Sequence, residues 1–288
     1  MCFNPANETN QLVPERKIPR CFVLGFSVHP TVGLEGQRAK APIRAVAIIP
    51  ARYASTRLPA KALADICGRP MIEHVYRQAS AAASVESVLV ATDDERIARA
   101  VTSFGGRYRM TRVDHRSGTD RLAEVAHTVR SDLIVNIQVD EPLIQPGMID
   151  AAVAACSNDP TVRMSTLRCP IRSAAALHDP DIVKVAVDRN DYALFFSRGS
   201  IGLHRTSEPE NWAVDKHIGV YVYQRSFLLT LSQLEPTPLE RSEKLEQLRV
   251  LEHGYRIMTT KTEHDSIGVD TPADLNVVRQ LVATEANS

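Results

Sequence analysis

The sequence predicts an α/β fold with a mostly parallel sheet and one inserted subdomain. The first indication is Ala45–Pro50, a short continuous apolar run typical of a strand buried on both faces of a parallel sheet. The second is the alternation of such runs with amphipathic segments through the first half of the chain. The third is a change after about Thr166, where strand-like segments are separated by polar turns. With 288 residues, 44% of them hydrophobic, the chain can bury a substantial core.

The first half alternates strands and helices. Apolar residues recur at helical spacing in two segments, and Asp93 or Asp94 can cap the second of them before Gly105 and Gly106 stop it. The predicted elements are the strand Ala45–Pro50, a helix from about Pro70 to Ala83, the strand Ser87–Thr92, a helix from about Asp94 to Phe104, and the strand Leu133–Val139.

The second half is mixed. Its strand-like segments predict an insertion over roughly residues 168–237, followed by a return to helices. The predicted elements are the strands Val183–Val187, Tyr192–Phe196 and Ile218–Tyr223, one long amphipathic helix Leu239–His253, the strand Tyr255–Lys261, and a final helix from Pro272.

Residues 1–43 show no sustained period, so we expect a poorly ordered extension before a single domain of residues 44–288. Two origins stay open for this extension. One is a transit peptide, which the acidic residues Glu8, Glu15 and Glu35 disfavour, and the other is a start codon assigned upstream of the true one.

The amino-acid composition limits the cellular compartment and the classes of binding partner that we expect for this protein. The chain has 34 basic and 34 acidic residues, so we expect neither nucleic acid nor an anionic membrane as a partner. Its five cysteines are odd in number and form no CxxC pair, which favours a reducing, cytoplasmic location. The apolar run Cys21–Val28 is far shorter than the ~20 residues of a membrane-spanning helix.

A cationic loop follows the first strand. It holds Arg52, Ser55, Arg57 and Lys61, together with Thr56, at the carboxyl end of a parallel strand, where doubly wound sheets bind ligands. Neither GxxxxGK[ST] nor GxGxxG is present, so side-chain cations would have to hold phosphates there. A solvated basic loop is the alternative, but the position after the first buried strand favours an anion site.

Two carboxylates can face the same crevice. Asp140 ends a buried strand, and Asp270 precedes the last helix. Mg²⁺ prefers oxygen ligands and often uses one or two carboxylates together with water and substrate phosphates. The alternative makes Asp140 a turn former and Asp270 a helix cap.

Other polar segments are candidates for substrate contacts. The stretch His115–Arg121 opens a helix, where backbone N–H groups and Arg121 could hold an anion or a sugar hydroxyl, although capping alone would explain its hydroxyls. His217, Tyr221 and Tyr223 share one face of a predicted strand, where a structural role is the alternative. GxSxG, HExxH and EF-hand motifs are absent, which argues against a hydrolase and against a zinc site.

Eight segments in order give the chain a family resemblance. From residue 45 to the final helix it resembles the 3-deoxy-manno-octulosonate (KDO) cytidylyltransferases. The matching segments are Ile48–Lys61, Ala91–Asp93, Asp114–Val125, Ile134–Ile144, Tyr192–Arg198, His217–Tyr223, Pro238–Gly254 and Gly268–Leu275.

The resemblance implies a nucleotide-diphospho-sugar transferase-like fold with an inserted dimerisation subdomain, hence a homodimer. It implies transfer of CMP from CTP to the anomeric hydroxyl of KDO, releasing pyrophosphate and giving CMP-KDO for lipopolysaccharide synthesis. By residue matching, Arg52, Ser55, Arg57 and Lys61 would hold the triphosphate, and Asp140 and Asp270 would hold Mg²⁺. The acid-sugar side would comprise Gln138, Arg198, His217, Tyr221, Glu246 and Gln247.

The chain departs from the family pattern at several positions. Ala60 and Ala62 replace the glycine and second proline of PGKP, Val139 replaces the glycine of QGDEP, and Gly202 replaces a proline. Val139 could reshape the acceptor pocket, because a β-branched residue adds bulk beside the expected metal ligand. Two alternatives therefore stay open: a paralogue that uses another small acid, such as phosphonoformate or a related acidic sugar, and a catalytically silent nucleotide-binding protein. A sialic-acid cytidylyltransferase fits the RYASTRLP loop less well.

Overall fold

The computed structural model describes residues 45–55, 57–115, 117–201 and 212–285. The predicted extension, residues 1–43, lies outside the described residues, and so do Thr56 and Gly202. Residues 40–288 form one unit, and its elements are described by themselves.

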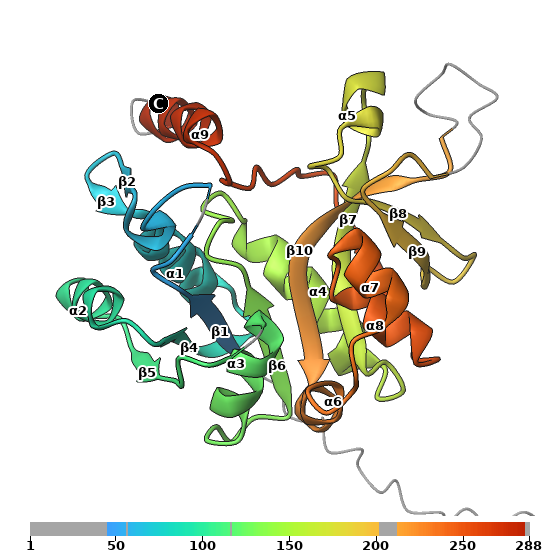
Figure 1. The fold of residues 1–288 in the computed structure, drawn as a ribbon, viewed down its shortest axis with the longest axis horizontal. Helices are drawn as coiled ribbons and strands as arrows, with labels where there is room; N and C mark the ends of the chain where they lie inside the picture. The colour runs from blue at the N-terminus through green and yellow to red at the C-terminus, as the bar shows by residue number, and fades with distance from the viewer. Residues whose placement is uncertain (1–44, 56, 116, 202–211, 286–288) are drawn as a thin grey trace, which may run out of the picture. The chain divides into compact units, whose positions relative to one another are not determined.

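The strands and helices alternate in the order that the sequence predicts (Figure 1). The strands are β1 (Ala45–Ala51), β2 (Asp65–Ile66), β3 (Arg69–Pro70), β4 (Val85–Thr92), β5 (Tyr108–Met110), β6 (Leu133–Ile137), β7 (Met164–Pro170), β8 (Lys184–Val187), β9 (Ala193–Ser197), β10 (Asp215–Gln224) and β11 (Met258–Lys261). The helices are the 3-10 turn η1 (Lys61–Leu63) and α1 (Met71–Ala81), α2 (Glu95–Ser103), α3 (Gly118–Ala126), α4 (Pro146–Asn158), α5 (Ala174–His178), α6 (Arg225–Leu231), α7 (Pro238–Glu243), α8 (Gln247–Glu252) and α9 (Pro272–Glu285).

The main sheet is mixed and mostly parallel, which confirms the predicted fold class. Within the described residues its strand order is β11-β7-β10-β6-β1-β4-β5, and β8 and β9 extend it beside β10. β1 pairs in parallel with both β4 and β6, β4 pairs in parallel with β5, and β7 pairs in parallel with β11. β10 is antiparallel to β6 and β7. The carboxyl ends of β1 and β6 therefore lie side by side.

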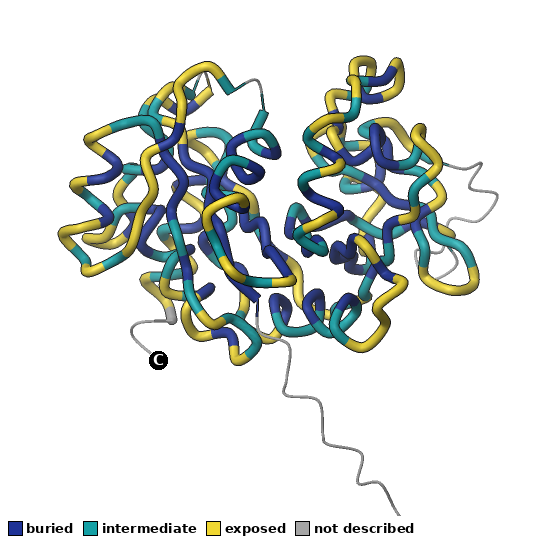
Figure 2. Tube along the Cα trace, turned by 90° about the horizontal axis from the view of Figure 1, so that it is seen from below, coloured by how far each residue is buried: buried dark blue, intermediate teal, exposed yellow. Residues whose placement is uncertain are grey.

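The sheet is buried on both faces, as the apolar run of β1 predicts. Ala47 and Ile49 belong to a core cluster with residues of α1, α2 and α4, whereas Val46 and Ile48 belong to a second cluster with residues of α3, α6 and α8. This alternation is the two-residue period of a strand. Figure 2 shows the buried residues concentrated on the central strands. No helix in the described part of the chain combines the length and apolar character needed to cross a membrane.

A smaller apolar cluster joins the end of the chain to its beginning. Leu58, of the loop after β1, and Met71, of α1, pack with Val269 and Leu275. This packing holds the segment before α9 beside the cationic loop, although more than 200 residues separate them in sequence. Apolar burial therefore places Asp270 near the carboxyl end of β1.

The helix caps are largely as predicted, but one predicted helix is wrong. Asp94 caps α2, and Ser117 caps α3 with a capping box. The single helix Leu239–His253 is instead two helices, α7 and α8, because Lys244 adopts a left-handed conformation with φ 54°. The break buries Leu245 in the second core cluster and turns Gln247 toward the site, so tertiary packing outweighs local helix preference.

The predicted insertion, residues 168–237, contains α5, β8, β9, β10 and α6. β10 pairs with β6 and β7 in the main sheet. The β8–β9 hairpin joins the sheet through β8, which pairs with the first two residues of β10. The boundaries of the insertion stay a prediction.

Ala60 occupies a conformation that favours glycine. It precedes η1 with φ 54° and ψ 33°, in the left-handed region, at the position where the family pattern has glycine. A residue with a Cβ atom pays roughly 1–2 kcal/mol there. The next residue is Lys61, so the backbone conformation of Ala60 sets the position of the Lys61 Cα and Cβ atoms.

We expect Ala60→Gly to raise the free energy of unfolding by roughly 0.5–1 kcal/mol, because the strain relieved exceeds the added flexibility of the unfolded chain. For a chain of this size the melting temperature should rise by roughly 1–4 °C, as measured by calorimetry. Ala64→Gly is the matched control. Ala64 has φ −59°, so there the same substitution should destabilise the protein. Equal effects at the two positions would contradict this account.

Candidate active site

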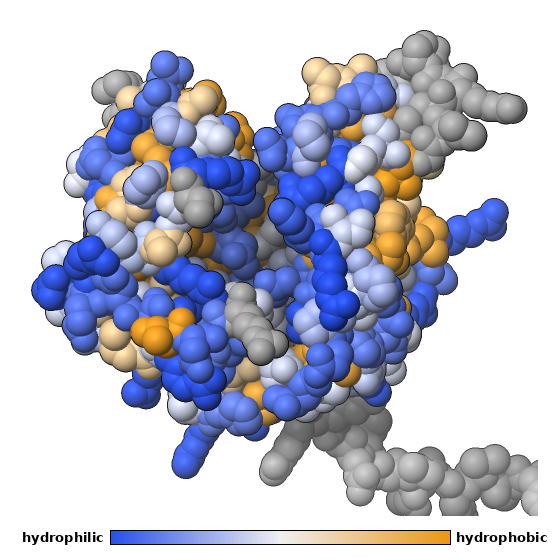
Figure 3. All heavy atoms as spheres, viewed as in Figure 1, coloured by the Kyte–Doolittle hydropathy of each residue, from blue (hydrophilic) through white to orange (hydrophobic). Residues whose placement is uncertain are grey.

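A cleft opens where β1 and β6 end. A cavity of about 560 Å³ and a second of about 210 Å³ share the lining residues Gln138, Gly219, Tyr221, Leu245 and Gln247. Figure 3 shows the hollow, with hydrophilic side chains along its walls. The shared lining makes the two cavities parts of one site.

The cationic loop lies at one side of this cleft. Nη2 of Arg52 donates to the backbone carbonyl oxygens of His115 and Ser117, at 2.6 and 3.3 Å. Arg52 therefore ties the loop after β1 to the start of α3. Ser55 lies in the same loop and is half-buried. Thr56 is outside the described residues.

Two cations and two carboxylates meet at the centre of the site. Nζ of Lys61 lies 2.6 Å from Oδ2 of Asp140 and 2.8 Å from Oδ1 of Asp270. Nη2 of Arg57 lies 2.9 Å from the other carboxylate oxygen of Asp270. Burial lowers the pKa of Lys61, but the two carboxylates outweigh it and raise the pKa above its ordinary value. Lys61 is therefore charged at neutral pH.

Asp140 and Asp270 offer the oxygen donors that Mg²⁺ prefers, and their role as its ligands stays a prediction. Oδ2 of Asp140 and Oδ1 of Asp270 both accept a hydrogen bond from Nζ of Lys61, so the two carboxylates lie close together around one positive charge. In the described part of the chain, no group of three or more His, Cys, Asp or Glu side chains could hold a metal. A pair of hard oxygen donors matches an ion that completes its shell with water and phosphate oxygens.

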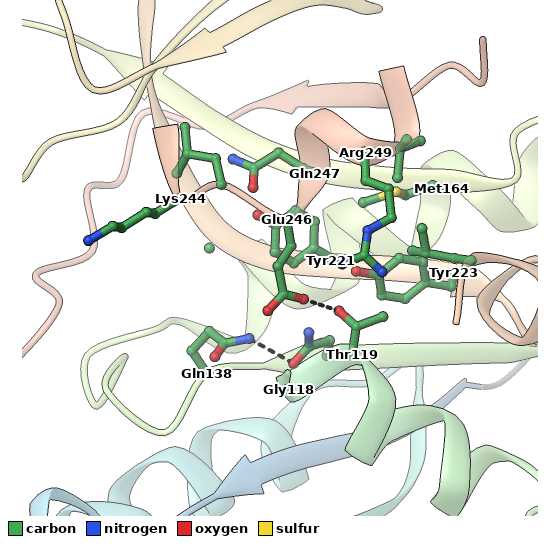
Figure 4. A pocket seen from close by; sticks show the side chains of 15 residues that line it. Gly118, Thr119, Gln138, Met164, Tyr221, Tyr223, Lys244, Glu246, Gln247 and Arg249 are labelled. Atoms are coloured by element: carbon green, nitrogen blue, oxygen red, sulfur yellow. Dashed lines mark hydrogen bonds between the residues drawn. The ribbon is translucent and has the colours of Figure 1, made fainter. Parts of the chain in front are cut away.

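The predicted acid-sugar residues surround the two cavities. Arg198 and His217 line the larger cavity, Glu246 lines the smaller, and Gln138, Tyr221 and Gln247 line both. Gln138 directly follows β6 and Arg198 directly follows β9, whereas His217 and Tyr221 lie in β10. Glu246 precedes α8, and Gln247 is its first residue. Figure 4 shows Glu246 and Thr119 hydrogen-bonded at 2.5 Å across the smaller cavity.

His217 is buried and neutral. Its Nε2 lies 2.9 Å from Oγ1 of Thr166, and its ring packs edge-on against Phe196. Burial lowers the pKa of His217 to about 3. At neutral pH it can orient a ligand by a hydrogen bond but does not carry a charge.

Arg121 lies apart from the other predicted residues. It is fully buried, its Nη1 donates to Thr111, and its Nη2 lies 3.2 Å from Oδ2 of Asp93. Its Nε and Nη2 have no hydrogen-bond partner with acceptable geometry in the described residues. Arg121 lines neither cavity of the cleft. A direct contact between Arg121 and the substrate stays a prediction.

Two residues that depart from the family pattern, Val139 and Ala62, do not line the cleft. Val139 packs against the first core cluster and lines neither cavity. Its φ is not positive, so no glycine is needed at this position. Ala62 is fully buried in the same cluster. Neither Val139 nor Ala62 therefore forms part of the cavity walls, and Gly202 is outside the described residues.

Sequence reasoning missed several residues of the cleft. Oδ1 of Asn136, buried in β6, accepts a hydrogen bond of 3.0 Å from Nε2 of Gln138 and so orients that amide. A polar residue within the apolar run of β6 was the available signal. Glu141 also lines the cleft and accepts a hydrogen bond from Ser266. The loss of hydration there, together with the neighbouring Asp140, raises the pKa of Glu141 to about 7.

Comparison with known proteins gives consistent matches over most of the chain. The cytidylyltransferase family model matches residues 46–257. The 3-deoxy-manno-octulosonate cytidylyltransferase of Geobacter sulfurreducens is 53% identical over 241 residues, covering 81% of this chain and 96% of the relative. That of Geotalea uraniireducens is 53% identical over 245 residues, covering 82% of this chain and 98% of the relative.

Solved structures agree with these relatives. CMP:2-keto-3-deoxy-manno-octonic acid synthetase complexed with CTP has a TM-score of 0.79 and 46% identity, covering 84% of this chain and 99% of that chain. A 4-diphosphocytidyl-2C-methyl-D-erythritol synthase from Anaerococcus prevotii has a TM-score of 0.55 and 12% identity, covering 84% of this chain and 99% of that chain, and shows the fold alone. Over its described domain, the chain belongs to the 3-deoxy-manno-octulosonate cytidylyltransferase family.

Proposed function

We propose that the chain transfers CMP from CTP to the anomeric hydroxyl of KDO, releasing pyrophosphate and forming CMP-KDO for lipopolysaccharide synthesis. The observation that carries this proposal is the meeting of Lys61 and Arg57 with Asp140 and Asp270 at the end of the sheet, beside a polar cavity. Relatives more than 50% identical over most of the chain bear the name of this activity.

On the nucleotide side, Arg52, Ser55, Arg57 and Lys61 hold the triphosphate. A cation about 4 Å from one negative charge contributes roughly 4 kcal/mol at an effective dielectric near 20, before desolvation. Lys61 and Arg57 are already held in the cleft by carboxylates, so their positions are set before the nucleotide binds. Such preorganisation reduces the ordering that binding requires.

Asp140 and Asp270 are the residues that would hold Mg²⁺. The ion supplies neutralisation of phosphate charge when it is bound. The two carboxylates also repel each other unless a cation lies near them. Lys61 provides such a cation, so the site keeps its geometry.

The transfer needs orientation more than a covalent nucleophile. The acceptor hydroxyl oxygen forms a bond to the α-phosphorus, the bond between that phosphorus and the oxygen bridging to the β-phosphate breaks, and the hydroxyl proton is released. Pyrophosphate leaves in line with the attack. The chain contributes by holding the acceptor in one cavity and the triphosphate beside it.

On the acceptor side, neutral polar groups contribute hydrogen bonds beside the guanidinium of Arg198. Gln247 is buried, and its Nε2 has no hydrogen-bond partner in the described residues, so an acceptor oxygen would satisfy it. Tyr221 stays protonated, since desolvation raises its pKa well above the ordinary value. With neutral His217, these groups present hydrogen bonds without adding charge.

KDO is favoured over the alternative acceptors. The paralogue hypothesis drew support from Val139 and Gly202. Val139 packs against the first core cluster and lines neither cavity, whereas Gly202 is outside the described residues. The silent-protein hypothesis expects the phosphate-binding and metal-binding positions to have lost their charged residues. Arg57, Lys61, Asp140 and Asp270 are all present, and their side chains converge.

A cytoplasmic homodimer is part of the proposal. Cys67, Cys156 and Cys169 are free thiols, in keeping with a reducing compartment. The homodimer rests on the similarity to the family.

We expect pyrophosphate release from CTP to depend on KDO. An assay across KDO, related acidic sugars and phosphonoformate should give kcat/KM for KDO at least about 10²-fold above that for the phosphonate, because buried polar groups left unpaired disfavour the smaller acid. Turnover with another acid and none with KDO would contradict the proposed acceptor.

We expect Asp140→Asn to lower kcat roughly 10³-fold, because stabilisation worth several kcal/mol is lost at the phosphates. The measurement is Mg²⁺-dependent turnover of CTP and KDO. Asp159→Asn, in a turn after α4, is the matched control and should keep wild-type activity. Near-normal Mg²⁺-dependent activity of the Asp140 variant would show that this carboxylate has no such role.

We expect His217→Gln to weaken the loss of stability in acid. Folded His217 stays neutral down to about pH 3, whereas an unfolded histidine gains a proton below about pH 6.5. The unfolded state then binds more protons between these values, so the free energy of unfolding falls as the pH is lowered. The difference in melting temperature between wild type and variant should therefore shrink from pH 7 to pH 4.

Calorimetry at several pH values measures this difference. His264→Gln, at an exposed histidine, is the control and should show the same pH dependence as the wild type. If the difference for the His217 variant stays constant with pH, His217 is not the buried neutral group described here.

A further inference from the structure

Lys184, the first residue of β8, is a fully buried lysine that forms no ion pair within the described residues. Its Nζ donates to three backbone carbonyl oxygens: those of Asp179 at 2.7 Å, Ile182 at 2.8 Å and Arg198 at 2.5 Å. An ammonium group has three N–H donors, so these bonds use all of them.

The three carbonyl groups belong to two separate segments of the cleft wall. Asp179 and Ile182 lie in the loop between α5 and β8, and Arg198 directly follows β9. All three residues line the larger cavity, as does Asp181 of the same loop. One buried ammonium group therefore joins the two segments that carry this side of the site.

The side chain of Arg198 depends on the same joint. Its Nη1 donates to the carbonyl oxygen of Pro180 at 3.2 Å, and its Nε donates to that of Glu243 at 3.2 Å. The carboxylate of Glu243 accepts from Ser197 Oγ and from the backbone N–H of Arg198, at 2.8 and 2.9 Å. A shift of the 179–182 loop would move the carbonyl group that orients this guanidinium.

A charged group is an expensive choice for this buried position. Burial lowers the pKa of Lys184, which reflects the desolvation of its charge. The groups that face it are Asp179, Arg198 and Glu243. An apolar side chain of similar length would avoid desolvation, but it would leave three carbonyl groups without their donor. An apolar side chain could fill this part of the core equally well. The ammonium group is explained by its hydrogen bonds, which hold the three carbonyl groups in place.

We propose that Lys184 is a positioning residue for the acceptor: its ammonium group locks the 179–182 loop to Arg198 and so holds the Arg198 guanidinium in the cavity wall. The assignment of the acceptor rests on the proposed function. The joint itself is a property of the fold and can be tested without turnover.

The kinetic test uses Lys184→Met, Arg198→Gln and the double variant in the full chain. Lys184→Met should raise KM for KDO about tenfold and change KM for CTP less than twofold. The double variant should have the KM for KDO of Arg198→Gln alone, because the effect of Lys184 passes through Arg198. Unchanged KM for KDO in Lys184→Met, or effects of the two substitutions that multiply, would overturn the proposal.

The matched control is Lys261→Met, the same substitution at an exposed lysine that ends β11. It should leave both KM values unchanged. If Lys184→Met is too unstable to assay, Lys184→Arg keeps the charge on a differently shaped side chain. Lys184→Arg should raise KM for KDO at least threefold. In the Arg198→Gln background it should have no further effect. A wild-type KM for KDO in Lys184→Arg would count against the proposal.

Hydrogen exchange separates this inference from the proposed function. In Lys184→Met, the amides of the 179–183 and 197–201 segments should exchange at least tenfold faster, while those of β1 and β6 keep their wild-type rates. Faster exchange together with no turnover of KDO by the wild type would refute only the acceptor. Unchanged exchange in both segments would refute the joint, whatever the activity.

Discussion

The site depends on the bridge from Lys61 to Asp140 and Asp270. These three residues follow β1, follow β6 and precede α9, so they meet only if β1 and β6 are adjacent and the end of the chain returns to the first loop. Parallel pairing supplies the first condition. The apolar cluster around Leu58 and Val269 supplies the second. Hydrophobic burial thus brings together charges that would otherwise remain solvated and apart.

The bridge also links the two halves of the chemistry. Carboxylates close enough to share a cation cannot both stay ionised without one, and a triphosphate needs cations close enough to share its charge. Placing Lys61 and Arg57 against the carboxylates meets both requirements with the same four side chains. The acceptor side differs: besides Arg198, its cavity has neutral, buried hydrogen-bonding groups such as His217 and Gln247. The positions of these two residues come from β10 and from the break between α7 and α8.

The first half of the fold follows directly from sequence. The strand at Ala45, the cap at Asp94 and the helix opening at Ser117 are local patterns, and the structure confirms each within a few residues. The predicted helix Leu239–His253 fails because nothing local marks Lys244 as a left-handed residue. A glycine would have given that signal. The small β2–β3 hairpin is likewise too short for its period to be detected.

The sequence by itself determined the fold class and which residues carry charge after which strand, because strand and helix periods and loop positions are local properties. It also carried the motifs of the family in order. Only the tertiary structure decided that Lys61 joins Asp140 to Asp270, that Arg121 lies outside the cavities, and that Val139 packs against the core without lining a cavity. Those outcomes depend on the packing of segments that are distant in sequence. The neighbouring residues in the sequence do not show in which direction a side chain will point across such a contact.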